Sequence, residues 1–225
     1  MYQTARDAAA YCSGRMSSFL PALRFGALTR FYDPVVAATT RERAFKRRLV
    51  DLAEPRAGER VLDVGCGTGT LAVELAARCP GARITGVDAD EAMLERARRK
   101  SPELDLHVAM AQDLPFGDAS FDLVVSSLFF HHLRRDDKLA VASELLRVMR
   151  PGARLAIADW GAPRDPLMRV AAQGIRLLDG AEPTSDNLAG RLPALLEQAG
   201  FVAVAERDTL RTAFGVMVLL TGAAP

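Results

Sequence analysis

The stretch from Val61 to Gly69 constrains the fold more than any other part of this chain. A short apolar run, Val61 to Val64, is followed at once by Gly65-Cys66-Gly67-Thr68-Gly69, and a helix-compatible apolar pattern resumes at Leu71. This order is typical of a strand, a glycine turn and a helix. Glycines let a ligand approach the backbone, and the start of a helix leaves N–H donors unpaired. We therefore expect the turn to bind a polar ligand.

Strand-like and helix-like segments alternate regularly from residue 60 onward. This alternation predicts an α/β fold with a mainly parallel sheet and helices on both faces. The last two strands are too close in sequence for a parallel crossover, so they must pair antiparallel. The expected strands are 61–64, 84–87, 104–109, 121–126, 154–159, 201–206 and 214–220, and the expected helices are 39–54, 70–78, 90–100, 136–149, 166–178 and 188–198.

The sequence pattern also predicts a division of the chain. Residues 1–58 are expected to form a helical N-terminal region, and residues 59–225 the main domain. The alternation pauses at 161–187, which we interpret as an insertion over the edge of the sheet. Together with the N-terminal region, this insertion is expected to make a lid.

Composition places the chain among soluble globular proteins, with 49% hydrophobic and 25% charged residues. Its three cysteines lack the paired spacing of a zinc site, which favours a reducing compartment and no bound metal. No apolar run approaches the roughly 18 residues of a membrane span, and the first residues lack the order of a signal peptide. A cytoplasmic location is predicted.

Charge is distributed unevenly along the chain. Residues 1–50 carry nine Lys/Arg against three Asp/Glu, a net +6, and the total of +1 leaves −5 for the remainder. The basic end could serve an anionic acceptor or a peripheral membrane contact, or it could be a solvated helix face. The acidic remainder argues against nucleic acid as a partner.

Polar residues follow four consecutive strands, at the edge where an open α/β sheet binds its ligand. They are Asp63 before the glycine turn, Asp88 after the second strand, Asp113 after the third and Ser126 at the end of the fourth. A carboxylate at a buried strand end costs stability unless it is bonded. Asp88 is placed to accept the two hydroxyls of a ribose.

Five motifs, read in order, resemble those of class I S-adenosylmethionine-dependent methyltransferases, in the small-molecule branch related to quinone biosynthesis. They are Val61-Leu-Asp-Val-Gly-Cys-Gly-Thr-Gly69, Gly86-Val-Asp88, Ala111-Gln-Asp113-Leu-Pro-Phe116, Phe121-Asp-Leu-Val-Val-Ser126 and Arg147-Val-Met-Arg-Pro-Gly152. The resemblance implies a Rossmann-like seven-stranded sheet whose last strand is antiparallel. It also implies S-adenosyl-L-methionine as the cofactor.

The resemblance assigns a role to individual residues of the cofactor site. The turn residues Gly65, Cys66, Gly67 and Gly69 would hold the methionine part, and Asp63 would orient its amino group. Asp88 would take the ribose hydroxyls, Ala89 and Met93 would line the adenine pocket, Asp113 would accept from the adenine amino group, and the Leu114 N–H would face a ring nitrogen. Ser126 would border the cofactor. Tyr32 would reach the cofactor carboxylate, or it would have a packing role.

Two other functions are compatible with this kind of fold. A nicotinamide-dependent oxidoreductase also uses a glycine turn and an acid, but Thr70 stands where its third glycine belongs. A non-catalytic interaction protein would need a damaged cofactor site, and the sequence shows none.

Methyl transfer from a sulfonium is an in-line displacement that mainly requires alignment of the acceptor and exclusion of water. His131 and His132 follow the fourth strand, and either could act as general base. A capping or loop-filling role for one of them is the alternative. The expected acceptor is a small apolar or aromatic molecule under the lid, and the side chains available to line its site are Phe19, Phe25, Phe31, Phe129, Phe130, Trp160, Met168 and Leu177.

Overall fold

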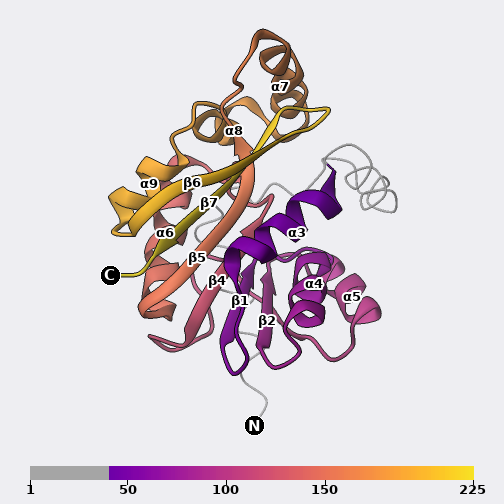
Figure 1. The fold of residues 1–225 in the computed structure, drawn as a ribbon, viewed down its shortest axis with the longest axis vertical. Coiled ribbons are helices and arrows are strands. Elements are labelled where there is room, and N and C mark those ends of the chain that lie inside the picture. The colour runs from indigo at the N-terminus through magenta and orange to yellow at the C-terminus, as the bar shows by residue number, and fades with distance from the viewer. Residues whose placement is uncertain (1–40) are drawn as a thin grey trace, which may run out of the picture.

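The computed structural model describes residues 41–225, which build a seven-stranded sheet covered by helices on both faces (Figure 1). The strand order is β3-β2-β1-β4-β5-β7-β6. The predicted α/β fold is therefore confirmed, with its seven strands. The strands are β1 (Arg60–Val64), β2 (Arg83–Asp88), β3 (Asp105–Val108), β4 (Phe121–Ser127), β5 (Met149–Gly161), β6 (Val202–Arg211) and β7 (Val216–Ala223).

The strand order reverses between β1 and β4, and this is where an open sheet of this kind binds its ligand. Strands β1 to β5 pair parallel with their neighbours, and Asp63 of β1 lies beside Gly86 of β2 and Val125 of β4. β4 occupies the centre of the sheet, as its apolar sequence predicts. β7 runs antiparallel to both β5 and β6, which confirms the predicted antiparallel last strand.

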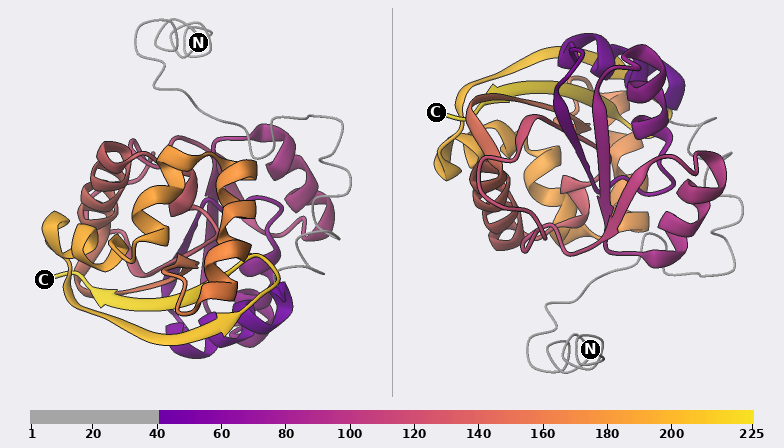
Figure 2. Two further views of the ribbon diagram at one scale, coloured as in Figure 1. Left: turned by 90° about the horizontal axis from the view of Figure 1, so that it is seen from above. Right: turned by 90° about the horizontal axis from the view of Figure 1, so that it is seen from below.

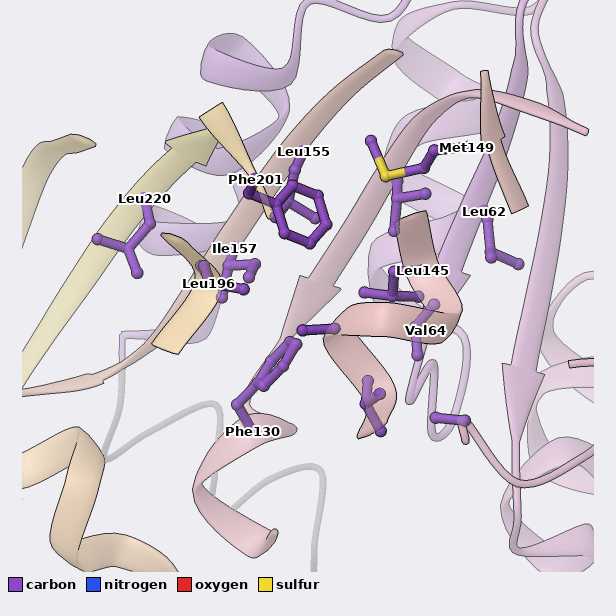
Figure 3. Packing of buried hydrophobic residues seen from close by; sticks show 14 of the residues in the cluster. Leu62, Val64, Phe130, Leu145, Met149, Leu155, Ile157, Leu196, Phe201 and Leu220 are labelled. Atoms are coloured by element: carbon purple, nitrogen blue, oxygen red, sulfur yellow. The ribbon is translucent and has the colours of Figure 1, made fainter. Parts of the chain in front are cut away.

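Helices cover the two faces of the sheet in separate groups (Figure 2). One core cluster joins the sheet to α3 and α4, and the other joins it to α6 and α9. Figure 3 shows the second cluster, where Phe130 packs with Leu145 of α6 and Ile157 of β5. The helices are α3 (Glu42–Ala53), α4 (Thr70–Arg78), α5 (Glu91–Lys100), the short 3-10 turn η2 (Phe130–His132), α6 (Arg135–Val148), α7 (Pro166–Asp179), α8 (Ala181–Leu188) and α9 (Leu192–Ala199).

Turn and cap chemistry explains why most predicted boundaries agree with the structure. Asp90 caps α5 by accepting a hydrogen bond from the Ala92 N–H at 2.9 Å. α3 ends at Ala53, two residues before Pro55, because a residue that precedes proline disfavours helical geometry. None of the helices within residues 41–225 has the length and apolarity that crossing a bilayer requires.

Four elements differ from the prediction, and one of them is the helix expected at 188–198, which begins at Leu192 as α9. α8 was not expected, because its sequence is polar and contains Pro183; this proline is the third residue of the helix, where its missing N–H costs no internal hydrogen bond. β5 begins at Met149 and continues through Pro151-Gly152. β6 extends to Arg211, because its polar second half pairs with β7 across two register shifts.

The predicted N-terminal lid begins outside the described residues. Tyr32 and the aromatic residues Phe19, Phe25 and Phe31 all lie there, so the division at residue 58 stays a prediction. The helix expected at 39–54 is present as α3, and its N-cap is Arg41. Glu42, in its first turn, forms an ion pair with Lys46 at 2.5 Å.

Candidate active site

The glycine turn between β1 and α4 has the backbone geometry that only glycine adopts readily. Gly65 and Gly67 have φ angles of 67° and 54°. A Cβ on Gly65 would lie 2.4 Å from the Phe129 ring, whereas a Cβ on Gly67 would meet nothing within 4 Å. α4 starts after Gly69 with no side chain capping its first turn. The N–H groups of Gly65, Cys66, Gly67 and Gly69 are bonded within the protein, so what the turn offers a ligand is close approach at Gly67 beside the uncapped first turn of α4.

Asp88 connects the end of β2 to this turn. Its carboxylate accepts hydrogen bonds from the Gly67 N–H at 2.8 Å and from the Asp90 N–H at 2.9 Å. Burial raises the pKa of Asp88, and the two backbone bonds partly oppose that effect. Because each carboxylate oxygen can accept a second bond, Asp88 retains acceptor capacity next to the glycine turn.

Asp63 is the most unusual carboxylate in the described part of the chain. It has no exposed surface, and neither of its oxygens has a hydrogen-bond partner. Burial raises its pKa to about 7, although the nearby Lys46 ammonium lowers it. A buried carboxylate without a partner is costly, which makes a ligand donor at this position energetically favourable. Cys66 lies three residues later, in the glycine turn, and burial raises the pKa of its thiol as well.

The residues predicted for the adenine pocket separate into two groups. Ala89 is half-buried at the end of β2, Met93 is buried on α5, and Asp113 is exposed in the loop after β3. The prediction that the Leu114 N–H faces a ring nitrogen is wrong. This N–H donates to Glu144 Oε1 at 2.7 Å, and the Leu114 side chain lies in the core. An N–H that already has a charged acceptor is not available to a ring nitrogen.

Ser126 has a structural bond that accounts for its position. Its hydroxyl donates to the Val64 carbonyl at 2.8 Å, and the residue is fully buried. This bond fixes β4 against β1 directly beneath the glycine turn. Two residues later, Leu128 has a φ of 53°, a conformation that a leucine adopts only when its surroundings impose it. This conformation of Leu128 places the Phe129 ring against Gly65.

His131 is held by a buried carboxylate from the next strand. Its Nδ1 lies 2.7 Å from Asp159 Oδ1, and both side chains are almost completely buried. Asp159 also accepts from the Trp160 N–H at 2.7 Å. Burial disfavours a charged imidazole, but the charge and hydrogen bond of Asp159 outweigh it and raise the pKa of His131. His131 is therefore fixed in position and orientation.

His132 is the more accessible of the two histidines, with 23% of its side chain exposed. Its ring centroid lies 4.0 Å from that of His131, and its Nδ1 lies 4.0 Å from Asp179 at the end of α7. Burial and the neighbouring His131 lower the pKa of His132 to about 3, so it is neutral near pH 7. Among residues 41–225, ligand atoms of His131, His132 and Asp179 come within 4.8 Å of one another, close enough to hold a metal ion.

Three carboxylates near the site were missed by sequence reasoning. Asp159 carried a readable signal, because it ends the fifth predicted strand just as the other acids end theirs. Glu144 and Asp179 carried none, since each lies on a helix and reaches the site only through the tertiary fold. Leu177, which was expected to line the acceptor site, is 86% exposed on α7. Phe130, Trp160 and Met168 are buried in the core.

Known proteins resemble this chain in both sequence and fold. A family model described as a methyltransferase domain matches residues 61–152. A demethylmenaquinone methyltransferase of Clavibacter sepedonicus is 34% identical over 192 residues, with 76% of each chain covered. The O-methyltransferase rstn1 of Aspergillus nomiae is 33% identical over 186 residues, covering 78% of this chain and 77% of that protein.

Some relatives are matched over a smaller share of their length. Solved structures show a likeness at the level of the fold. The chain spans little more than half of two other demethylmenaquinone methyltransferases, 55% and 57% of their lengths. The crystal structure of a SAM-dependent methyltransferase from Aquifex aeolicus has a TM-score of 0.64 and 20% identity. That comparison covers 92% of this chain and 100% of the other.

Proposed function

Because the chain belongs to the class I S-adenosylmethionine-dependent methyltransferases, we propose that it transfers the methyl group of S-adenosyl-L-methionine to a small apolar or aromatic acceptor. The observation that carries the proposal is the pairing of Asp88 with the glycine turn through the Gly67 N–H. This pairing puts an acceptor for ribose hydroxyls next to the glycine turn and the uncapped first turn of α4. The product would be S-adenosyl-L-homocysteine together with the methylated acceptor.

The residues of the site fit this cofactor. Asp63 has buried acceptor oxygens with no partner, and an amino group is a donor of the right charge for them. Gly67 has open space, and the first turn of α4 has no side-chain cap. We assign the ribose to Asp88 and the methionine part to the residues of the glycine turn, Gly65, Cys66, Gly67 and Gly69. Ala89, Met93 and Asp113 would line the adenine pocket.

The cofactor supplies an electrophilic sulfonium methyl group, so the protein has to align the acceptor and exclude water. The strained Leu128 and the packed Phe129 make a fixed wall after β4. We assign the general base to His132, because its imidazole is the more exposed of the two and is the one that an acceptor hydroxyl could reach. His131, held by Asp159, is then a positioning residue.

The acceptor class rests on the chemistry of the wall and on the named relatives. One relative is named for demethylmenaquinone and another as an O-methyltransferase, so a quinol or phenol is the favoured acceptor. Such acceptors are apolar, which agrees with a site bounded by Phe129. A cytoplasmic location and a peripheral contact of the basic N-terminal region with membranes are part of the same proposal.

Transfer of a labelled methyl group tests the proposal. The full chain would be offered labelled S-adenosyl-L-methionine with 1,4-dihydroxynaphthalene, simple phenols, small amines and phospholipid headgroups. We expect transfer to a hydroxylated aromatic compound and unchanged activity after treatment with a chelator. Transfer abolished by the chelator and restored by a divalent cation would instead make His131, His132 and Asp179 a metal site. Absence of cofactor binding and of any transfer would reject the enzyme.

A further inference from the structure

Helix α7 exposes apolar side chains along one of its faces. At about 100° per residue, the exposed positions occupy an arc of roughly 100° around the helix. The opposite side is buried: Met168, Ala172 and Ile175 anchor the helix to the protein. The exposed residues are Leu167 at 66%, Val170 at 72%, Leu177 at 86% and Leu178 at 52% exposure.

This face, defined by Leu167, Val170, Leu177 and Leu178 and called the α7 face below, accounts for most of the strongly exposed apolar surface. In the part of the chain that the structure describes, the other large exposed hydrophobics are only 41–48% exposed, and they lie outside α7. Isolated exposed apolar residues are ordinary, but four on one side of one helix form a contiguous strip. Burial of such a strip against another surface is favourable.

The charges beside the α7 face have one sign. Arg169 and Arg176 are exposed along one margin of the strip. Within residues 41–225, neither guanidinium lies within ion-pair distance of a carboxylate, whereas Arg164 and Arg211, just outside the helix, are both paired. The only acid of the helix is its last residue, Asp179, which turns inward toward His131. The surface is thus complementary to an anionic partner.

The shape of the surface favours a lipid bilayer over a protein groove. α7 lies at one extremity of the molecule, beyond the carboxyl end of β5 (Figure 1), and its 14 residues extend about 21 Å. An apolar strip flanked by arginines is the pattern of helices that lie in the plane of a membrane interface. Arginine side chains can keep their charged ends at the phosphates while their stems lie along the apolar region.

We propose that the α7 face docks on an anionic lipid surface, with the four apolar side chains among the acyl chains and both arginines at lipid phosphates. Docking would bring a membrane-dissolved acceptor close to the histidines, because Asp179 ends α7 at 3.7 Å from His131 Nε2. The delivery of an acceptor to the histidines rests on the proposed function, whereas the docking on lipid does not. Lipid binding is measured without turnover, so its failure is distinguishable from failure of the methyl transfer.

Vesicle sedimentation of the full chain tests the docking. We expect binding to vesicles of phosphatidylglycerol and phosphatidylcholine that weakens with salt, and much weaker binding to phosphatidylcholine alone. Val170→Ser with Leu177→Ser should weaken binding by roughly tenfold or more. Arg169→Gln and Arg176→Gln should each weaken it by roughly fivefold on anionic vesicles, as expected for about 1 kcal/mol per charge.

Val202→Ser is the matched control, because Val202 is exposed at 47% on β6, outside the α7 face. It should leave lipid binding unchanged, and circular dichroism would verify that all variants fold. No binding of the unaltered chain to anionic vesicles would overturn the proposal. So would equal binding of the Val170→Ser/Leu177→Ser variant, which would place lipid contact elsewhere in the chain. Loss of a dimer in that variant without lipid binding would assign the face to a second copy.

Discussion

Replacing Asp63 with asparagine should change how the stability of the cofactor-free protein depends on pH. The Asp63 carboxyl is fully buried, and neither oxygen has a hydrogen-bond partner. Its pKa is raised from 3.8 to about 7, mainly by burial. A carboxyl with a higher pKa in the folded chain binds its proton more tightly there, so it stabilises the fold below about pH 4 and loses this contribution as pH rises toward 7.

The size of the effect follows from the pKa shift. A rise of roughly three units corresponds to about 4 kcal/mol of unfolding free energy, at 1.36 kcal/mol per unit. The unaltered protein should lose about that much between pH 4 and pH 8. Asp63→Asn mimics the protonated carboxyl, so it should lack this decline and become the more stable of the two above pH 7.

Chemical denaturation at a series of pH values, in the absence of cofactor, measures both curves. Asp51→Asn is the control, because Asp51 is a surface residue paired with Arg78 and should leave the pH dependence as it is. Parallel curves for Asp63→Asn and the unaltered protein would refute the reasoning. That result would mean that Asp63 is ionised and solvated or paired in the folded chain.

Four further substitutions, one of them compared with Gly67→Ala, test other parts of the account. Gly65→Ala should cost about 1–3 kcal/mol more stability than Gly67→Ala. Both glycines have a positive φ, but only at Gly65 would the added Cβ lie 2.4 Å from the Phe129 ring. Equal losses in denaturation would contradict this. His132→Gln should lower kcat about 100-fold with cofactor affinity retained, and full activity would remove the base. His131→Gln should mainly lower the unfolding free energy measured in denaturation, because the buried Asp159 loses the imidazole and keeps only backbone donors. Asn187→Leu should raise the unfolding free energy by about 1–2 kcal/mol, because the side-chain oxygen and nitrogen of Asn187 are both buried without partners. A decrease would indicate that the Asn187 side chain forms a hydrogen bond.

Proline, glycine and capping residues made most of the fold predictable. The bounds of α4 (Thr70–Arg78) and α5 (Glu91–Lys100) were predicted correctly. A glycine turn precedes α4, and a capping aspartate precedes α5. The strands were recognisable as apolar runs. α8 was not predicted, since its polar sequence is buried through contacts with η2, α7 and β5 that the tertiary fold creates. Periodicity cannot indicate a helix whose buried residues are Thr184, Asp186 and Asn187.

The sequence predicted only those residues of the candidate site that lie at the ends of strands. Asp63 and Asp88 were identified because parallel strands bring their carboxyl ends to one edge. The partners that decide their roles come from distant segments: Glu144 takes the Leu114 N–H, and Asp159 fixes His131. Contacts between residues about 30 positions apart leave no local pattern in the sequence.

Equilibrium binding of S-adenosyl-L-methionine tests the central claim most directly. Calorimetry should show binding to the unaltered chain and no comparable binding of NAD. Asp88→Ala should weaken the affinity by about 1.5–3 kcal/mol, roughly 10- to 150-fold, the usual contribution of hydrogen bonds to a charged group. Unchanged affinity in Asp88→Ala would contradict the placement of the ribose, and no binding of S-adenosyl-L-methionine at micromolar concentrations would contradict the methyltransferase itself.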